Sequence, residues 1–96
     1  MLDLKSGTRI VLARDILLRA EEELGRYYAF NTRSGDHFSL NHTAYWALQQ
    51  TCGGITCDDL LNAFREQYGL DPDTASTDLS DTLTDAYTAG IIEEDR

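Results

Sequence analysis

The spacing of apolar residues changes at Asn41 from the period of a strand to that of a helix. Residues 37–40 (HFSL) alternate polar with apolar, whereas the following small and apolar residues recur at i, i+3, i+4 and i+7, namely Ala44, Ala47, Leu48 and Thr51. Strand-like segments therefore precede Asn41 and helix-like segments follow it. Such a segregated order predicts an α+β fold rather than alternating βαβ units.

Three segments before Asn41 read as strands: residues 16–20, 26–30 and 37–40. The first is apolar, the second is rich in aromatic residues and the third is short. Residues 21–25 and 31–36 separate them and collect turn-forming side chains. We expect a three-stranded antiparallel meander.

Three helices are expected after the strands. Asn41 is a suitable N-cap for the first, which stops at Gly53-Gly54. Thr56 caps the second, which ends at Gly69, and the third starts at residues 71–74 (DPDT) and ends before Gly90. Its apolar stripe consists of Ala75, Leu79, Leu83, Ala86 and Tyr87. This order resembles a winged-helix arrangement. Residues 1–96 are expected to form one domain, with residues 1–9 as a flexible tail.

Charge is distributed unevenly along the chain, whose formal net charge is −9. Residues 1–35 carry six basic and five acidic side chains, whereas residues 36–96 carry two basic and twelve acidic ones. Such a surface repels nucleic acid and anionic lipid, because phosphate binding depends on Lys and Arg. The start of the chain has neither the basic nor the apolar stretch of a signal peptide, and no segment is long enough for a membrane span. We therefore expect a cytoplasmic protein without nucleic-acid or membrane partners.

Catalytic and metal-binding patterns are weak. Cys52 and Cys57 lie five residues apart with His37 and His42 upstream, but structural zinc sites have tighter, paired spacings. The cysteines are better explained as small apolar fillers in a reducing compartment. Neither histidine has a nucleophile or an orienting carboxylate at motif spacing, and Gly53-Gly54 matches no phosphate-binding loop. We expect no metal, no cofactor and no enzymatic activity.

An open strand edge is the more promising feature. The third strand of a meander lies at the edge of its sheet, where its free backbone groups can accept an extended peptide. A loop could equally cap this edge. The residue pattern leaves both possibilities open.

Several short motifs carry a family resemblance: Leu40-Asn41-His42-Thr43-Ala44; Gly53-Gly54-Ile55-Thr56 before Asp59-Leu60; Tyr68-Gly69-Leu70-Asp71-Pro72; and Ala89-Gly90-Ile91-Ile92. Their order and spacing resemble the pyrroloquinoline quinone biosynthesis protein D (PqqD) family, and residues 7–16 resemble the start of such proteins. Members of this family recognise precursors of ribosomally made, post-translationally modified peptides (RiPPs).

The resemblance implies a winged-helix-like fold that binds the leader segment of a precursor peptide as an added strand. The leader would lie along the third strand, at His37, Phe38, Ser39 and Leu40. The third helix would wall the cleft with Asp78, Leu79, Thr82, Leu83 and Ala86, and the pockets between Leu79 and Leu83 would take apolar anchors. The domain would then present the leader to a modifying enzyme such as a radical SAM enzyme, a peptidase or a cyclase.

An acidic rim of Asp78, Asp81 and Asp85 predicts a leader with some Lys or Arg. The chain departs from the family pattern at Thr51-Cys52, where an apolar and an acidic residue are typical. Trp46 lies off the apolar stripe of its helix and belongs either to the core or to a surface that docks an enzyme.

Two other functions fit the same order of elements. One is an adaptor that binds a folded partner protein and leaves the strand edge unused. The other is a winged-helix DNA-binding regulator, which is disfavoured because residues 74–89 contain three aspartates and no Lys or Arg. The oligomeric state stays open between a monomer and a homodimer formed through the strand edge.

Overall fold

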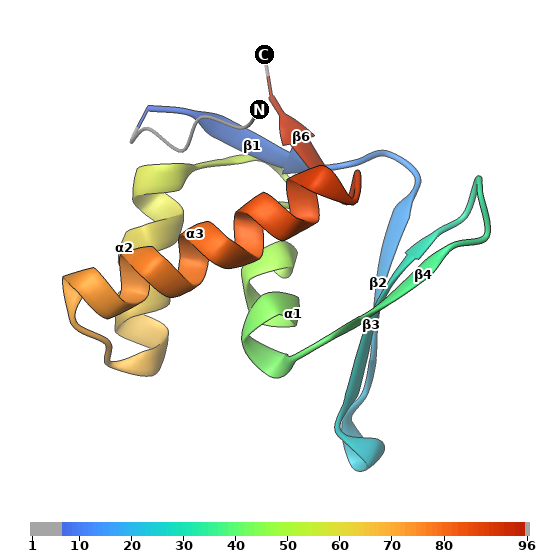
Figure 1. Cartoon of the computed structure of the whole chain (residues 1–96), viewed down its shortest axis with the longest axis horizontal. Coiled ribbons are helices and arrows are strands. Elements are labelled where there is room, and N and C mark those ends of the chain that lie inside the picture. The colour runs from blue at the N-terminus through green and yellow to red at the C-terminus, as the bar shows by residue number, and fades with distance from the viewer. Residues whose placement is uncertain (1–6, 96) are drawn as a thin grey trace.

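The computed structural model describes residues 7–95, and its larger elements follow the predicted order of three strands and then three helices (Figure 1). The larger sheet contains β2 (Ile16–Glu21), β3 (Arg26–Asn31) and β4 (His37–Leu40), with a short 3-10 helix, η1 (Glu22–Leu24), between β2 and β3. The helices are α1 (His42–Gln49), α2 (Cys57–Tyr68) and α3 (Pro72–Thr88). The predicted α+β fold, with its three-stranded antiparallel sheet and three helices, is confirmed.

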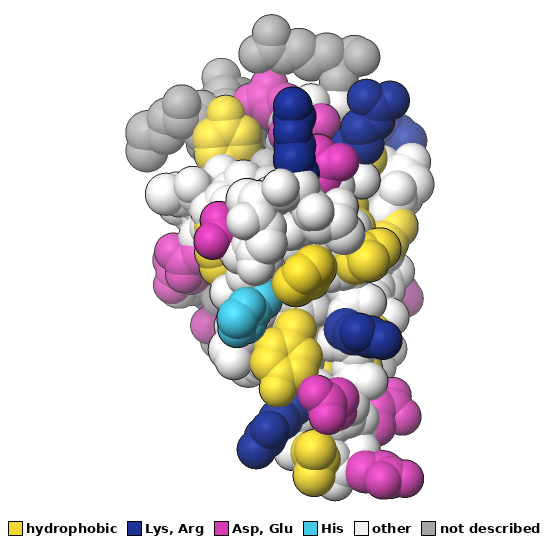
Figure 2. Space-filling view, turned by 90° about the vertical axis from the view of Figure 1, so that its right-hand side faces the viewer, with side chains coloured by type: hydrophobic (Ala, Val, Ile, Leu, Met, Phe, Trp, Pro, Cys, Tyr) yellow, Lys and Arg dark blue, Asp and Glu magenta, His cyan; other side chains and the backbone are white. Residues whose placement is uncertain are grey.

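The larger sheet has one covered and one uncovered face. Cross-strand rows such as Leu18, Ala29 and Phe38 form the inner face, which packs into the core with Ala29 fully buried. The alternate residues form what we call the outer face, and Figure 2 looks onto this side of the molecule. The outer face consists of Leu17, Arg19 and Glu21 from β2, Arg26, Tyr28 and Phe30 from β3, and His37 and Ser39 from β4.

Side-chain caps start all three helices as the sequence predicts. The side chains of Asn41, Thr56 and Asp71 accept hydrogen bonds from the backbone N–H groups of Ala44, Asp59 and Thr74, at 2.7, 3.2 and 2.7 Å. The bond from the Thr74 backbone lowers the pKa of the Asp71 carboxyl, because it favours the ionised form. Gly69 ends α2 in the left-handed conformation, with φ of +62°.

The core lies among the three helices, the inner face of the larger sheet and the small strands that carry Ile10 and Ile92. The predicted stripe of α3 is confirmed, since Ala75, Leu79, Leu83 and Ala86 are all buried and Tyr87 is partly buried. Leu60 and Phe64 of α2 belong to the same buried cluster. No helix within residues 7–95 is long and apolar enough to cross a membrane.

A second sheet was not predicted from the sequence. It consists of β5 (Ile55–Thr56), β1 (Arg9–Leu12) and β6 (Ile92–Glu94), in that order. The prediction of a flexible tail over residues 1–9 is therefore wrong at Arg9, and also at Thr8, whose carbonyl accepts a hydrogen bond from the Cys57 N–H at 2.8 Å. Residues 1–6 of that tail lie outside the described residues.

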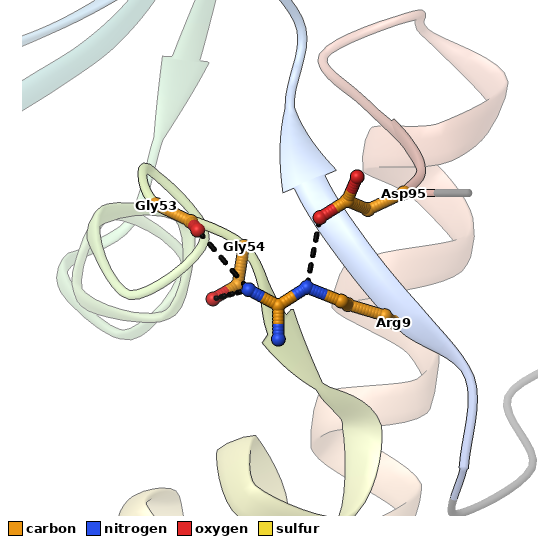
Figure 3. Close-up of polar contacts among 4 residues, drawn as sticks. All are labelled: Arg9, Gly53, Gly54 and Asp95. Atoms are coloured by element: carbon orange, nitrogen blue, oxygen red, sulfur yellow. Dashed lines mark hydrogen bonds and ion pairs between the residues drawn. The ribbon is translucent and has the colours of Figure 1, made fainter.

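The Arg9 side chain of β1 forms hydrogen bonds to the segments next to β5 and β6 (Figure 3). Its Nε donates to the Asp95 carboxylate at 2.8 Å, and its Nη2 donates to the carbonyl oxygens of Gly53 and Gly54, both at 3.3 Å. One side chain thus joins the segment after β6 to the loop between α1 and β5. We call this arrangement the Arg9 clamp.

Gly54 leaves the room that the Arg9 clamp needs. A Cβ at this position would lie 2.7 Å from Asp95 Oδ2 and 2.9 Å from Arg9 Nη2, and the φ of +83° disfavours any side chain. We expect Gly54→Ala to lower the free energy of unfolding by about 1–3 kcal/mol, measured by urea denaturation. Gly53→Ala is the matched control, because nothing lies within 4 Å of its Cβ position. Equal urea midpoints for the two variants would contradict this prediction.

Candidate functional site

The free edge of β4 is the first part of the candidate site. Within the described residues β4 pairs with β3 alone, in the register Phe38 with Ala29 and Leu40 with Tyr27. The Asn31 N–H donates to the Asp36 carbonyl at 2.8 Å, in the same register. Because hydrogen-bonded pairs alternate along an antiparallel ladder, Phe38 and Leu40 also bond to β3. The backbone N–H and C=O groups of His37 and Ser39 therefore point away from the sheet.

A cleft of mixed polar and apolar lining lies beside this edge, between β4 and α3. It has a volume of about 300 Å³. The β4 side contributes Phe38, Ser39, Leu40 and Asn41, α1 contributes Ala44 and Leu48, and the α3 side contributes Thr82, Asp85, Ala86, Ala89 and Ile91. Phe38 and Leu40 are only partly buried, so their side chains remain available to a bound molecule. We call this hollow the β4–α3 cleft.

Five of the nine residues proposed for peptide binding line the β4–α3 cleft: Phe38, Ser39, Leu40, Thr82 and Ala86. His37 belongs to β4, but its side chain lies on the outer face with Tyr28 and Phe30.

Leu79 and Leu83 do not line the β4–α3 cleft. They lie in a different groove, between α2 and α3, together with Leu61 and Ser80. Asp78 is exposed on α3 and lines neither hollow. The apolar stripe of α3 is thus largely used to pack the helix onto α2, whereas the cleft is lined by its neighbouring face.

Six lining residues were not among the nine residues predicted to bind the peptide: Asn41, Ala44, Leu48, Asp85, Ala89 and Ile91, of which Asp85 was expected only in the acidic rim. The small residues of α1 are visible in the sequence, but their periodicity indicates a core stripe and not a cleft wall. Ala44 is partly buried and Leu48 is fully buried, so α1 forms the floor of the cleft. The small side chain of Ala44 leaves space in the cleft above α1.

The electrostatic character of the cleft depends on one carboxylate. Asp85 lines the hollow and is exposed to solvent. Asp78 and Asp81 are also exposed, but neither lines the cleft. Of the three aspartates in the predicted acidic rim, Asp85 alone lines the cleft.

A family model described as coenzyme PQQ synthesis protein D (PqqD) matches residues 16–92. The chain belongs to the PqqD family. The matched span contains β2 to α3 and stops at the first residue of β6, so it includes the whole β4–α3 cleft.

A solved structure shares the fold of this chain. TbiB1 in complex with the TbiA(beta) leader peptide is similar to this chain with a TM-score of 0.73. The similarity covers 86% of this chain and 94% of that chain at 16% sequence identity, and it therefore concerns the fold. Among curated proteins, none matches significantly.

The departure from the PqqD pattern at Thr51-Cys52 has a local structural explanation at Thr51. This side chain is fully buried, and its hydroxyl donates to the Leu48 carbonyl at 2.7 Å. Its own carbonyl accepts from the Leu12 N–H at 3.0 Å, so Thr51 connects α1 to β1. Cys52 is exposed, which is inconsistent with the predicted role as a core filler, whereas Cys57 is buried as expected.

Trp46 contacts the aromatic core of this PqqD-family chain. Its ring centroid lies 6.0 Å from that of Phe64 and 5.8 Å from that of Tyr68. Trp46 is partly buried against the core cluster, which agrees with the core alternative. The Tyr68 hydroxyl forms a hydrogen bond of 3.2 Å with His42 Nδ1. The pKa of Tyr68 is raised, mainly because the hydroxyl is partly desolvated and to a smaller extent because Tyr27 lies nearby.

Within residues 7–95, no three His, Cys, Asp or Glu side chains form a group that could hold a metal ion.

Proposed function

We propose that this chain is a non-catalytic protein that binds the leader segment of a ribosomal precursor peptide and presents it to a modifying enzyme. The observation that carries the proposal is the free edge of β4 next to the β4–α3 cleft. An extended peptide added at this edge gains main-chain hydrogen bonds, and alternate side chains enter the cleft. Membership of the PqqD family and the fold shared with leader-bound TbiB1 support the proposal.

The two parts of the site have different tasks. His37 and Ser39 present outward backbone groups, and each hydrogen bond formed there contributes about 0.5–1.5 kcal/mol whatever the leader sequence. Apolar leader side chains that reach Phe38, Leu40 and Ala86 provide the selective part of the affinity. The backbone therefore sets the direction and register of the leader, while the cleft selects its sequence.

An NMR titration tests the function directly. Labelled protein is titrated with synthetic peptides that cover the leaders of short open reading frames beside its gene. We expect amide shifts at residues 37–41 and along the cleft-lining positions Thr82, Ala86 and Ala89. Shifts confined to α2, or binding of folded partner proteins without any leader binding, would favour the adaptor function instead.

Asp85 favours a leader with a basic side chain near its apolar anchor. We expect Asp85→Asn to weaken leader binding about two- to fivefold and to reduce its dependence on salt, because an exposed ion pair contributes little. Isothermal titration at two salt concentrations measures both effects. Asp78→Asn is the matched control on the same helix, since Asp78 lies outside the cleft. Salt-independent affinity of the unmodified chain would contradict this prediction.

A further inference from the structure

The outer face of the larger sheet exposes apolar side chains that the leader site does not use. Leu17 is 58% exposed and Phe30 is 38% exposed, although they are direct cross-strand partners. His37 continues the same row on β4. A shallow hollow of about 450 Å³ lies here, lined mainly by Leu17, Arg19, Glu21, Tyr28, Phe30 and His37. Figure 2 shows apolar side chains along this face, with charged ones around them.

The packing of the domain leaves this apolar pair exposed. Helix α1 packs against the inner face of the sheet, where Ala29 is fully buried, and no described helix covers the outer face (Figure 1). An apolar cross-strand pair that faces solvent loses the free energy that burial would give it. Contiguous exposed apolar groups rimmed by polar ones are typical of protein-interaction surfaces.

The charge of the outer face differs from that of the whole chain. It carries Arg19 and Arg26 against a single glutamate, Glu21, whereas the formal net charge of the chain is −9. A surface with apolar side chains and carboxylates at its border is therefore complementary to this face. A second copy of this chain is a poorer occupant, because a symmetric contact would bring two arginine-bearing faces together.

The outer face is also continuous with the proposed leader site. Side chains of a strand alternate between the two faces of a sheet. A leader added beside β4 would thus place one set of side chains in the β4–α3 cleft and the other set next to His37 and Ser39 on the outer face. A protein docked on this face would contact both the domain and the leader.

We propose that the outer face, centred on Leu17 and Phe30 with Arg19 beside them, is the docking surface for the enzyme that modifies the peptide. The inference rests on the proposed function only for the nature of this partner. It assigns the two faces of one sheet to two partners: the leader at the edge and inner side, and an enzyme with an acid-rimmed apolar surface on the outer side.

The test uses the full chain and each purified enzyme encoded beside its gene. The variant Leu17→Thr/Phe30→Thr keeps strand-forming residues and removes the apolar pair. We expect its affinity for the enzyme, measured by biolayer interferometry, to fall about tenfold or more. Its affinity for the leader peptide should stay within about twofold, because neither Leu17 nor Phe30 lines the β4–α3 cleft and neither belongs to the β4 edge. Leu24→Thr is the matched control, since Leu24 is 62% exposed but lies in η1 and outside the face.

A second variant tests the contribution of charge to enzyme binding. Arg19→Gln should weaken enzyme binding and flatten its salt dependence without changing the urea midpoint. Retained enzyme affinity in the Leu17→Thr/Phe30→Thr variant would overturn the inference, as would leader binding by a chain that binds none of the enzymes. Sedimentation as a dimer that this variant converts to a monomer would assign the face to a second copy and would also overturn it. Enzyme binding through this face without leader binding would support the inference and refute the proposed function.

Discussion

Ser39→Pro is expected to abolish most leader binding while the domain stays folded. The Ser39 N–H points away from β3, so a proline there removes a donor that an added strand needs and sacrifices no bond within the sheet. Loss of this bond, with the leader's carbonyl left unpaired, costs about 1–3 kcal/mol, which corresponds to roughly 5- to 150-fold weaker binding. Isothermal titration with a leader peptide measures the change.

The opposite edge of the same sheet provides the control for Ser39→Pro. By the same alternation, the Ala20 N–H of β2 also points outward from an edge strand. Ala20→Pro removes an equivalent donor far from the β4–α3 cleft, and leader affinity should be unchanged. Ser39→Val keeps the backbone donor and should retain affinity as well. Equal weakening by Ser39→Pro and Ala20→Pro would show that proline disturbs the whole sheet, and would refute strand addition at β4.

Thr82→Trp is expected to have a comparable effect by a different route. Thr82 is partly buried on α3 and lines the β4–α3 cleft, so an indole at this position fills the space that we propose for the leader's anchor. Exclusion of one anchor costs about 2 kcal/mol or more, a loss of roughly 30-fold in affinity. Fluorescence anisotropy with a labelled leader peptide measures it.

Ser80→Trp is the matched control because Ser80 has the same degree of burial but lines the groove between α2 and α3. This comparison also decides between two positions for the anchor. If Ser80→Trp weakens binding and Thr82→Trp does not, the leader uses the groove that contains Leu79 and Leu83, as the sequence predicted. If only Thr82→Trp weakens it, the anchor enters the β4–α3 cleft.

The elements that could be predicted are those in which a period of apolar residues or a helix cap is visible in the local sequence. Alternation in β4, the aromatic residues of β3 and the side-chain caps at Asn41, Thr56 and Asp71 determine the larger sheet and the three helices. The small sheet escaped prediction because its strands have two to four residues. Their pairing partners are distant in sequence, as with Ile10 and Glu94, and no local period indicates such contacts.

The site was predicted in part for a similar reason. Periodicity shows that Leu79 and Leu83 face inward, but it does not show whether they face α2 or β4. Packing of α3 onto α2 uses these leucines and leaves Thr82, Ala86 and Ala89 toward β4. Ala86 belongs to the buried stripe and also lines the β4–α3 cleft. The exposed pair Leu17 and Phe30 could not be recognised in the sequence, because apolar strand residues indicate burial by default.

The Arg9 clamp has a consequence for the order in which the chain can fold during its synthesis. Arg9 and Asp95 are 86 residues apart, and β1 pairs with β6 near the opposite end of the described chain. Closing so long a loop carries an entropic cost, and on a ribosome it must wait until β6 has emerged. The β2–β3–β4 hairpins involve only neighbouring segments and need nothing beyond Leu40. The free edge of β4 can therefore form early, whereas the small sheet closes the domain as one of the last steps.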